Sequence, residues 1–354
     1  MQQNTPAALD ELPPPPPGKT GWPWTEPSPH PVCTVLDNPS WPRISIVTPS
    51  YNQGEYIEEA IRSILLQNYP NTEYIVIDGG STDHSTEVIQ KYGPWLTYWV
   101  SEPDRGQAHA INKGFALCTG DLVGWINSDD GLLPGGLATL AAAFRRSPTS
   151  ILLGDVLNID EVYEHAWLRQ QKNVTFETLS QPGHHNAFWQ QPGTFWPRAL
   201  YLQIGDMDES LRYLFDLDWM CRALQVAPVH YLRTTIALFR LHDTSKTVHE
   251  SAMWDSERCV VAERYWGQGG GGRKLRAALS MHLAANRLRV LSWNRSGALK
   301  HLRDAIGQRW LTVSMPKFWG LCIKAALPRR LLESLRALRS RFSPGSCPHD
   351  TEGV

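Results

Sequence analysis

Residues 44–52 read Ile-Ser-Ile-Val-Thr-Pro-Ser-Tyr-Asn, an apolar run rich in β-branched side chains that ends at a proline and turns polar. The run predicts a buried strand, because β-branched side chains pack well on a pleated surface and proline cannot continue a central strand. Residues 57–65 then place their apolar side chains on one helical face, and residues 73–77 form a second apolar run. A strand, a helix and a second buried strand in this order are typical of a βαβ unit with parallel strands.

The same alternation continues along the first half of the chain. Further strands are expected at 96–100, 121–126 and 151–156, and further helices at 83–92, at 108–117 and after Pro134. The strand segments are apolar throughout, which is typical of parallel strands that are buried on both faces. The sequence therefore predicts an α/β fold in which a mainly parallel sheet is flanked by helices.

The polar segments that follow the strands indicate where a ligand would bind. They are Pro49–Asn52, Asp78–Asp83, Ser101–Gly106 and Asn127–Asp130. In sheets of this kind, ligands bind beyond the carboxyl ends of the strands. Three of the four segments carry acidic residues, so the predicted site is acidic.

The segment Asn127-Ser-Asp-Asp130 directly follows a predicted strand, so its carboxylates should project into this site. Two adjacent aspartates in a tight turn can offer hard oxygen ligands to Mg²⁺ or Mn²⁺, completed by phosphate oxygens and water. Such an ion would stabilise the charge that develops on a leaving diphosphate. A solvated turn is the alternative interpretation, because aspartate and serine are common turn residues.

The segment Asp78-Gly-Gly-Ser-Thr-Asp83 is suited to a nucleoside, since its two glycines allow a ligand to approach the backbone closely. Asp78 can accept hydrogen bonds from a nucleobase or a ribose. Asp83 either joins it or caps the next helix. Tyr51, which closes the first strand, either stacks on a base or packs as an ordinary aromatic side chain.

Four motifs thus occur in a fixed order, each after a predicted strand. They are Thr-Pro-Ser-Tyr-Asn at 48–52, Asp-Gly-Gly-Ser-Thr-Asp at 78–83, Glu-Pro-Asp-Arg-Gly-Gln-Ala-His-Ala-Ile-Asn-Lys-Gly at 102–114 and Asn-Ser-Asp-Asp at 127–130. Together they resemble the family 2 glycosyltransferases, which have the GT-A fold, a Rossmann-like α/β fold. The resemblance covers residues 44–245. Each motif alone is weak, but their combination in this order is specific.

The resemblance implies a role for each matching residue. The nucleotide and the donor sugar would be held by Pro49, Tyr51, Asn52, Asp78, Asp83, Arg105, Asn112, Asn127, Ser128 and Asp130, and Asp129 would be the metal ligand. Asn127 departs from the family pattern, which has an acidic residue there. Its amide can bind a ribose or a metal-bound water but adds no charge. Arg105 has an alternative role, an ion pair with Asp104 or Glu102.

The resemblance also points to a catalytic base in the segment Tyr213–Arg222. Alignment on Trp219 and Arg222 places Asp216 at the base position, with Phe215 in place of the usual glutamate. Asp218 would support it, since residues at i and i+2 do not share a helix face. An inverting transfer needs such a carboxylate to take the proton of the acceptor hydroxyl. The alternative is an acidic helix start that complements the helix dipole.

Two later segments are expected on the acceptor side. Residues 189–196, Trp-Gln-Gln-Pro-Gly-Thr-Phe-Trp, resemble the part of the family that lines the acceptor and donor-sugar site. Trp189, Gln190, Gln191 and Trp196 would contact sugars, although packing alone also explains the two tryptophans. Residues 239–245 resemble the family's late strand and loop. There His242 would bind the metal or the diphosphate, and Arg240 and Lys246 would neutralise phosphate.

The remaining sequence suggests additional parts. Residues 1–42 contain five consecutive prolines and predict a disordered tail. Residues 43–265 would form the transferase domain, with a nucleotide-binding half at 43–130 and an acceptor half at 131–265. The glycine run 269–272 would be a hinge. Residues 273–342 predict basic amphipathic helices, which either lie on an anionic membrane surface or cap the domain.

Composition limits the partners and the compartment. The chain has 34 basic and 35 acidic residues, which does not favour a nucleic-acid partner. Its six cysteines lack Cys-X-X-Cys spacing and indicate reduced, buried thiols. No apolar run reaches the ~18 residues of a membrane span, and no signal peptide is evident. These features favour a cytoplasmic protein, either free or peripheral to the inner face of the plasma membrane.

The sequence as a whole predicts an inverting hexosyltransferase of polysaccharide biosynthesis that uses Mg²⁺ or Mn²⁺. It would transfer a sugar from a nucleotide-diphosphate sugar, with UDP favoured, to a hydroxyl of a glycan or lipid-linked acceptor. One alternative is a sugar nucleotidyltransferase, but the glycine-rich basic loop of those enzymes is absent after the first strand. Another is a catalytically degenerate scaffold, favoured by Asn127 and Phe215 and opposed by Asp78, Asp129, Asp130 and Asp216.

Overall fold

The structure is a computed structural model of the 354-residue chain. It describes residues 7–26, 28, 41–180, 189–243, 245, 257, 260–261, 264–265, 277, 280–281, 284, 295–308, 318–319 and 321–322. The chain divides into two compact units, Met1–Val261 and Ala262–Val354, and each is described by itself.

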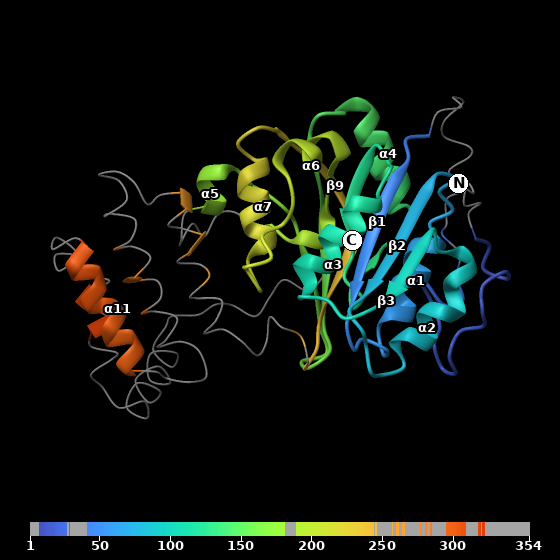
Figure 1. Ribbon diagram of the computed structural model, residues 1–354, viewed down its shortest axis with the longest axis horizontal. Coiled ribbons are helices and arrows are strands. Elements are labelled where there is room, and N and C mark those ends of the chain that lie inside the picture. The colour runs from blue at the N-terminus through green and yellow to red at the C-terminus, as the bar shows by residue number, and fades with distance from the viewer. Residues whose placement is uncertain are drawn as a thin grey trace, which may run out of the picture. The chain divides into compact units, whose positions relative to one another are not determined.

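The first half of the large unit alternates strands and helices as the sequence predicts (Figure 1). It forms β1 (Ile44–Ser50), α1 (Ile57–Leu65), β2 (Thr72–Asp78), α2 (Ser85–Tyr92), η2 (Gly93–Trp95), β3 (Tyr98–Ser101), α3 (Gln107–Leu117), β4 (Leu122–Trp125), β5 (Gly131–Leu132) and α4 (Gly136–Arg146). The second half forms β6 (Ile151–Asp160), β7 (His165–Arg169), α5 (Phe176–Ser180), η3 (Gln191–Gly193), β8 (Thr194–Pro197), α6 (Arg198–Ile204), α7 (Phe215–Ala223) and β9 (Val229–Leu241).

In the described part of the chain these strands build one sheet in the order β3-β2-β1-β4-β8-β6-β9-β5, with β7 paired to β6. The first four strands are parallel, as predicted. Beyond β4 the sheet is mixed, because β8 runs antiparallel to both β4 and β6, while β6 and β9 are parallel. The α/β fold class is confirmed, and the parallel arrangement is confined to the half that carries the four motifs and to the β6–β9 pair.

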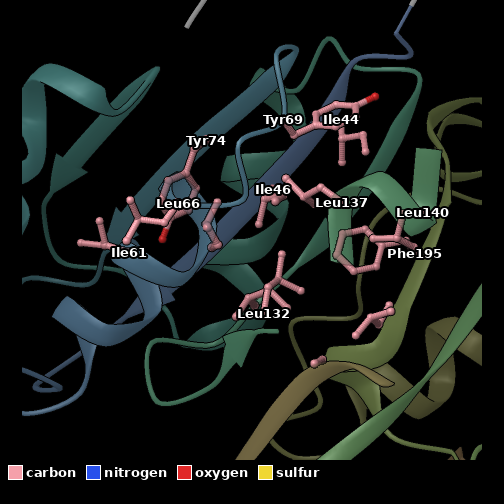
Figure 2. Packing of buried hydrophobic residues seen from close by; sticks show 14 of the residues in the cluster. Ile44, Ile46, Ile61, Leu66, Tyr69, Tyr74, Leu132, Leu137, Leu140 and Phe195 are labelled. Atoms are coloured by element: carbon pink, nitrogen blue, oxygen red, sulfur yellow. The ribbon is translucent and has the colours of Figure 1, made fainter. Parts of the chain in front are cut away.

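Helices cover both faces of the sheet because alternate residues of the buried strands point to opposite sides. Ile44 and Ile46 of β1 join side chains of α1 and α4 in the main hydrophobic cluster (Figure 2). Val47 points to the other face, where α3 packs so closely that a Cβ on Gly114 would lie 2.4 Å from a methyl group of Val47. The sheet is therefore fixed between two layers, and its carboxyl edge is held in place.

The second half is more regular than its sequence suggests. The thirteen-residue strand β9 pairs with β6 from Ile151↔Val229 to Asp160↔Leu241. This long pairing was not predicted, because β9 mixes polar and apolar side chains and has neither a clean period of two nor a continuous apolar run. It carries residues 240 and 241 to the same edge of the sheet as the first-half loops.

The predicted disorder of residues 1–42 is wrong for residues 7–26, which pack on the domain. Arg62 of α1 is fully buried, and its guanidinium donates to the backbone oxygens of Pro13, Pro23 and Trp24. A buried guanidinium needs several acceptors, and a proline-rich segment outside any ladder has unpaired carbonyl groups to offer. The indole N–H of Trp22 also donates to the backbone oxygen of Leu132. The remaining residues of this tail lie outside the described part.

The small unit contains the helix α11 (Arg295–Gln308). Leu302 and Ala305 of this helix join Met281, Ala284, Phe318 and Leu321 in a small buried cluster. Within the described residues, no helix is both long and apolar enough to cross a membrane. The predicted hinge at 269–272 and most of the predicted amphipathic segment 273–342 lie outside the described residues, as does Lys246.

Candidate nucleotide-sugar site

The loops that carry the four motifs lie side by side, as the parallel topology requires. At the carboxyl edge of the sheet, Ser50 is in register with Asp78, and Asp78 with Ser101. The amide of Gly79 donates to the oxygen of Ser50 at 2.8 Å. Beyond β4, the amide of Ile126 donates to the oxygen of Val47 at 3.0 Å. The predicted site is therefore assembled at one edge of the sheet.

Asp78 organises its own loop and has no exposed surface. Its Oδ2 accepts from the amides of Gly80 and Ser81 and from the hydroxyl of Ser101. Its Oδ1 accepts from the hydroxyl of Ser81 at 2.5 Å. The carboxylate is buried and uses its acceptor capacity to shape this loop, so its contact with a nucleobase or ribose stays a prediction.

Asp83 and Asn52 connect the first two motif loops. Oδ2 of Asp83 accepts from the amide of Gly54, while Oδ1 accepts from the amide and hydroxyl of Ser85 at the start of α2. Burial alone would raise the pKa of Asp83, but these hydrogen bonds lower it below its usual value. The side-chain oxygen of Asn52 accepts from the amide of Thr82. The helix-start alternative for Asp83 is therefore the one the structure shows.

Pro49 and Tyr51 behave differently, although both belong to the first motif. Pro49 lies within β1, opposite Ile77, and is buried. Tyr51, just after the strand, has a side chain that is 60% exposed. An exposed ring at the carboxyl edge of the sheet is available to stack on a planar ligand.

The third motif is tied to the loop before α7. Arg105 pairs with Glu209 at 2.7 Å, and Glu102 pairs with Lys113, so the alternative pairing of Arg105 with Asp104 or Glu102 is wrong. Asn112 is buried, and its amide exchanges hydrogen bonds with the backbone of Met207. This amide therefore holds the 207–209 loop, and the nucleotide contact of Asn112 stays a prediction.

In the fourth motif only one carboxylate is presented to the site. Asp130 is buried: Oδ2 accepts from Asn127 and Oδ1 from the amide of Arg240. Burial and the adjacent charge of Asp129 raise the pKa of Asp130 well above its usual value. The neighbouring Ser128 is also buried. The Asn127 oxygen accepts from Gln107, so Asn127 joins α3 to the motif.

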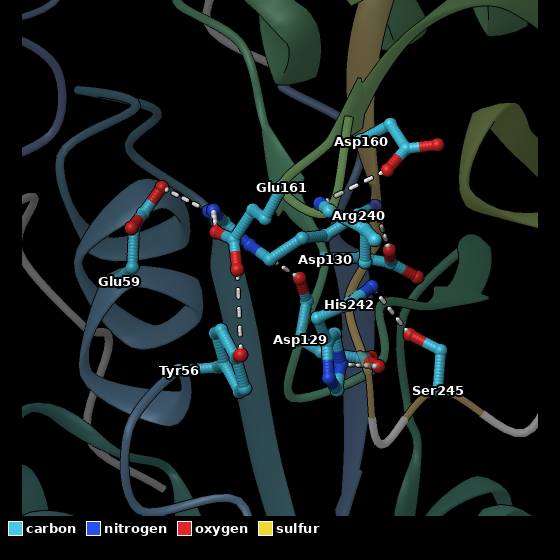
Figure 3. Close-up of polar contacts among 10 residues, drawn as sticks. Tyr56, Glu59, Asp129, Asp130, Asp160, Glu161, Arg240, His242 and Ser245 are labelled. Atoms are coloured by element: carbon cyan, nitrogen blue, oxygen red, sulfur yellow. Dashed lines mark hydrogen bonds and ion pairs between the residues drawn. The ribbon is translucent and has the colours of Figure 1, made fainter. Parts of the chain in front are cut away.

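Asp129 has its carboxylate partly exposed and close to His242. The distance from Oδ2 of Asp129 to Nε2 of His242 is 3.1 Å, and the two side chains face each other in Figure 3. Tyr56 packs against the imidazole with ring centroids 4.3 Å apart. A carboxylate and an imidazole are both metal ligands. Among the described residues they do not extend to a set of three such side chains, so further ligands would have to come from the substrate or water.

Arg240 supports the pair formed by Asp129 and His242. Its guanidinium pairs with Glu59 of α1 and with Glu161, which follows β6, and donates to the backbone oxygen of Asp129 (Figure 3). Burial alone would lower the pKa of Arg240, but the two glutamates raise it above its usual value. The two glutamates already neutralise the charge of Arg240, and its phosphate contact stays a prediction. The roles of Glu59 and Glu161 were missed, because each is an unremarkable acidic residue in the sequence.

The two acidic residues of α7 have different surroundings. Asp218 is buried and pairs with Arg222 at 3.2 Å, and Arg222 donates to the backbone oxygens of Ile204 and Asp206. Asp216 is partly buried, and its Oδ1 accepts from the amide of Leu217 at 2.6 Å. Burial, and then the charge of Glu257, raise the pKa of Asp216 to about 7. Asp218 is thus held in a buried ion pair, whereas Asp216 has a raised pKa and no such pair among the described residues.

The expected acceptor segment is only partly available. Trp196 is 1% exposed and packs on Trp219, with ring centroids 4.2 Å apart, so its ring serves core packing and its sugar contact stays a prediction. Gln190 exchanges two hydrogen bonds with Asn158. Gln191 donates to the backbone oxygen of Trp125. Trp189 donates to Thr194 at 2.9 Å and remains partly exposed.

Comparison with known proteins agrees with this arrangement. The profile of Glycosyl transferase family 2 matches residues 45–203. An uncharacterized glycosyltransferase of Mycobacterium tuberculosis (strain H37Rv) is 38% identical over 207 residues, which cover 56% of this chain and 76% of the relative. An uncharacterized glycosyltransferase of Rickettsia typhi is 27% identical, over 58% of this chain and 66% of the relative. One of Nostoc is 33% identical, over 33% of this chain and only 37% of the relative.

A solved structure, S. aureus TarS 1–349 in complex with UDP-GlcNAc, has a TM-score of 0.59 at 17% identity and covers 83% of this chain and 92% of that one. This likeness establishes the shared GT-A fold. With the matching profile and the Mycobacterium relative, the ordered motifs at the carboxyl edge of the sheet show that the chain belongs to glycosyltransferase family 2.

Proposed function

We propose that the protein is an inverting glycosyltransferase that moves a sugar from a nucleotide-diphosphate sugar to a hydroxyl acceptor. Family membership supports sugar transfer. Two solved structures of similar fold are complexes of S. aureus TarS with UDP-GlcNAc and with UDP, which supports a nucleotide sugar, and UDP in particular, as donor. This chemistry fits the arrangement of Asp216 and of the facing side chains of Asp129 and His242.

The contrast between Asp216 and Asp218 carries the proposal. Asp218 has Arg222 as a partner, whereas Asp216 has no basic partner among the described residues, and its pKa is raised to about 7. The preceding residue, Phe215, packs near Trp125, with ring centroids 6.4 Å apart, and Trp125 ends β4 two residues before Asn127. The carboxylate therefore lies on the element that packs beside the fourth motif, with a proton affinity suited to a general base.

Asp216 would take the proton of the acceptor hydroxyl. The acceptor oxygen forms a bond to the anomeric carbon of the donor sugar, from the face opposite the phosphate. The bond between this carbon and the phosphate oxygen breaks, and the nucleoside diphosphate leaves with the bonding electrons. Attack from the opposite face inverts the anomeric configuration.

Asp129 and His242 would hold Mg²⁺ or Mn²⁺ together with oxygens of the diphosphate. Their facing Oδ2 and Nε2 atoms, 3.1 Å apart, fit two positions of a divalent ion, and phosphate oxygens and water suit the others. When bound, the ion would stabilise the negative charge of the leaving diphosphate. The scaffold alternative is weaker than the sequence suggests, because Asn127 is used to bridge Gln107 and Asp130.

We extend the proposal to a hexose donor, a glycan or lipid-linked acceptor, a role in polysaccharide biosynthesis and attachment to the inner face of the plasma membrane. In the small unit, the side chains of Trp319 and Leu299 are 54% and 52% exposed. Exposed apolar side chains within a basic helical segment suit contact with an anionic lipid surface.

The test is release of nucleoside diphosphate by the purified full chain from UDP-, GDP-, dTDP- and CDP-sugars, with Mn²⁺, Mg²⁺ or EDTA. We expect metal-dependent release from at least one donor, and NMR of the released or transferred sugar should show an inverted anomer. Release without inversion would overturn the mechanism. A folded protein that binds nucleotide diphosphates but releases none from any donor would support the scaffold instead.

A further inference from the structure

The carboxylate of Asp104 stands in the space that a side chain at position 79 would occupy. An ideal Cβ built on Gly79 would lie 2.6 Å from Oδ2 and 3.0 Å from Cγ of Asp104. The next residue, Gly80, has a positive φ of 82° and runs past the backbone of Pro103. The glycine pair therefore leaves room for a carboxylate that comes from the neighbouring motif.

This carboxylate is fixed at one oxygen and open at the other. Oδ1 accepts from the amide of Gly106 at 2.7 Å, at the start of α3. Among the described residues Oδ2 has no hydrogen-bond donor, and the cations Arg105 and Lys113 pair with Glu209 and Glu102 instead. A partly buried carboxylate with one free oxygen and no paired cation among the described residues is suited to accept a hydrogen bond from a ligand.

Asp104 and Tyr51 border the same strip of backbone. Gly79 follows β2, which lies between β3 and β1 in the sheet, and its amide donates to the residue before Tyr51. Asp104 follows β3 on one side of this strip, and the exposed ring of Tyr51 follows β1 on the other. A planar base stacked on Tyr51 would present its edge to the glycine backbone and to Asp104.

We propose, on the basis of the function proposed above, that Asp104 reads the base of the donor nucleotide. Its Oδ2 would accept the N–H at the centre of the pairing edge, which uracil and guanine have and cytosine lacks. Asp78, the carboxylate that the sequence suggests for this task, is buried and fully bonded. The specificity of the site therefore comes from the third motif, across the gap that Gly79 leaves.

The substitution Asp104→Asn gives a directed test. Because the amide of Gly106 requires an acceptor, the asparagine oxygen should take the place of Oδ1, and the NH₂ group should replace Oδ2. A hydrogen-bond donor, the NH₂ group, then faces the base. It cannot bond to the N–H of uracil or guanine, but it can donate to the ring nitrogen of cytosine.

Binding of UDP, GDP, CDP and ADP to the full chain would be measured by calorimetry with Mn²⁺ present. We expect the wild type to bind UDP or GDP at least about 10-fold more tightly than CDP. In Asp104→Asn this preference over CDP should fall by about 10-fold or more, so that CDP binds as tightly as UDP or GDP, or more tightly. Glu102→Gln, in the same loop but paired with Lys113, should leave the ratio unchanged. Gly79→Ala, whose methyl group would displace Asp104, should weaken UDP or GDP binding with no change of charge.

The outcomes separate this inference from the function on which it rests. A wild type that binds none of the four nucleotides overturns both. A wild type that binds nucleotides but prefers CDP, or an Asp104→Asn variant that weakens UDP and CDP equally, overturns the inference alone. Thermal melting without nucleotide establishes that each variant is folded.

Discussion

Nε2 of His242 lies 3.1 Å from Oδ2 of Asp129, although the two residues belong to opposite halves of the domain. Each is supported by a second group: Tyr56 packs against the imidazole, and Arg240 donates to the backbone oxygen of Asp129. The pair is therefore preorganised. Because packing and hydrogen bonds already set the geometry of the two ligands, less of the metal's binding free energy is lost in ordering them.

The first prediction concerns the metal. His242→Ala should raise the Mn²⁺ concentration needed for half-maximal activity by about 10-fold or more, because loss of even a residue that only hydrogen-bonds to a metal ligand costs about 10–100-fold in metal affinity. High Mn²⁺ should restore part of the rate. The measurement is nucleotide release as a function of Mn²⁺ concentration.

The control for this variant is His165→Ala, which removes an exposed imidazole from β7. It should leave the Mn²⁺ requirement unchanged. An unaltered requirement in His242→Ala, with the fold intact, would remove His242 from the metal site.

The sequence anticipates the first-half framework well, because its strands and helices are local patterns. β1, β2 and α1 match their predicted positions within one or two residues. A common metal site for Asp129 and His242 is predictable from the sequence, since both residues occur in recognisable motifs. The positions of the side chains were harder to predict: Asp78, Asn112 and Trp196 are of the right residue types for a site, yet packing directs each into the protein.

Other features depend on contacts between distant parts of the chain. Nothing near Arg240 in the sequence indicates that Glu59 will neutralise it from α1. Likewise, a proline-rich segment has the composition of a disordered tail until the acceptors required by Arg62 are known. These relationships arise from burial and from the need to satisfy buried polar groups, which no local pattern encodes.

The second prediction separates the two aspartates of α7. Asp216→Asn should lower kcat by about 10²–10⁴-fold, the usual contribution of a general base, with little change in nucleotide binding. Asp218→Asn is the matched variant on the same helix. It should weaken the buried pair with Arg222 and lower the melting temperature, with a much smaller effect on kcat per folded molecule. The reverse pattern would assign the base to Asp218.

The third prediction follows from the pKa of Asp216, about 7. A base must be ionised to accept a proton, so kcat of the wild type should fall tenfold per pH unit below about pH 7. A rate that stays constant from pH 8 down to pH 5.5 would contradict this assignment. Nucleotide binding without metal, measured over the same pH range, is the control. Unchanged binding with a falling kcat means that the catalytic base has been protonated, whereas weaker binding means that the donor nucleotide is no longer held.

The same pKa has a consequence for stability. The folded protein holds the Asp216 proton more tightly than the unfolded chain does, whose aspartates have a pKa near about 3.9. Stability contributed by this group is therefore lost as pH rises from about 4 to about 7. Asp216→Asn should raise the melting temperature at pH 8 and change it little at pH 4. The exposed Asp10→Asn should show no such pH dependence.

The last prediction concerns Arg62 and the segment 7–26. Arg62→Met should lower the free energy of unfolding by about 2–4 kcal/mol, because buried carbonyl acceptors and the hydroxyl of Tyr92 lose their donor. Removal of residues 1–26 should also destabilise the domain, by leaving the buried guanidinium without these acceptors. In the shortened chain, Arg62→Met should then lower the free energy of unfolding much less, or raise it.

The control is the exposed Arg146→Met, which should leave the free energy of unfolding nearly unchanged in both the full and the shortened chain. Additive effects of truncation and Arg62→Met in chemical denaturation would mean that the guanidinium does not hold this segment.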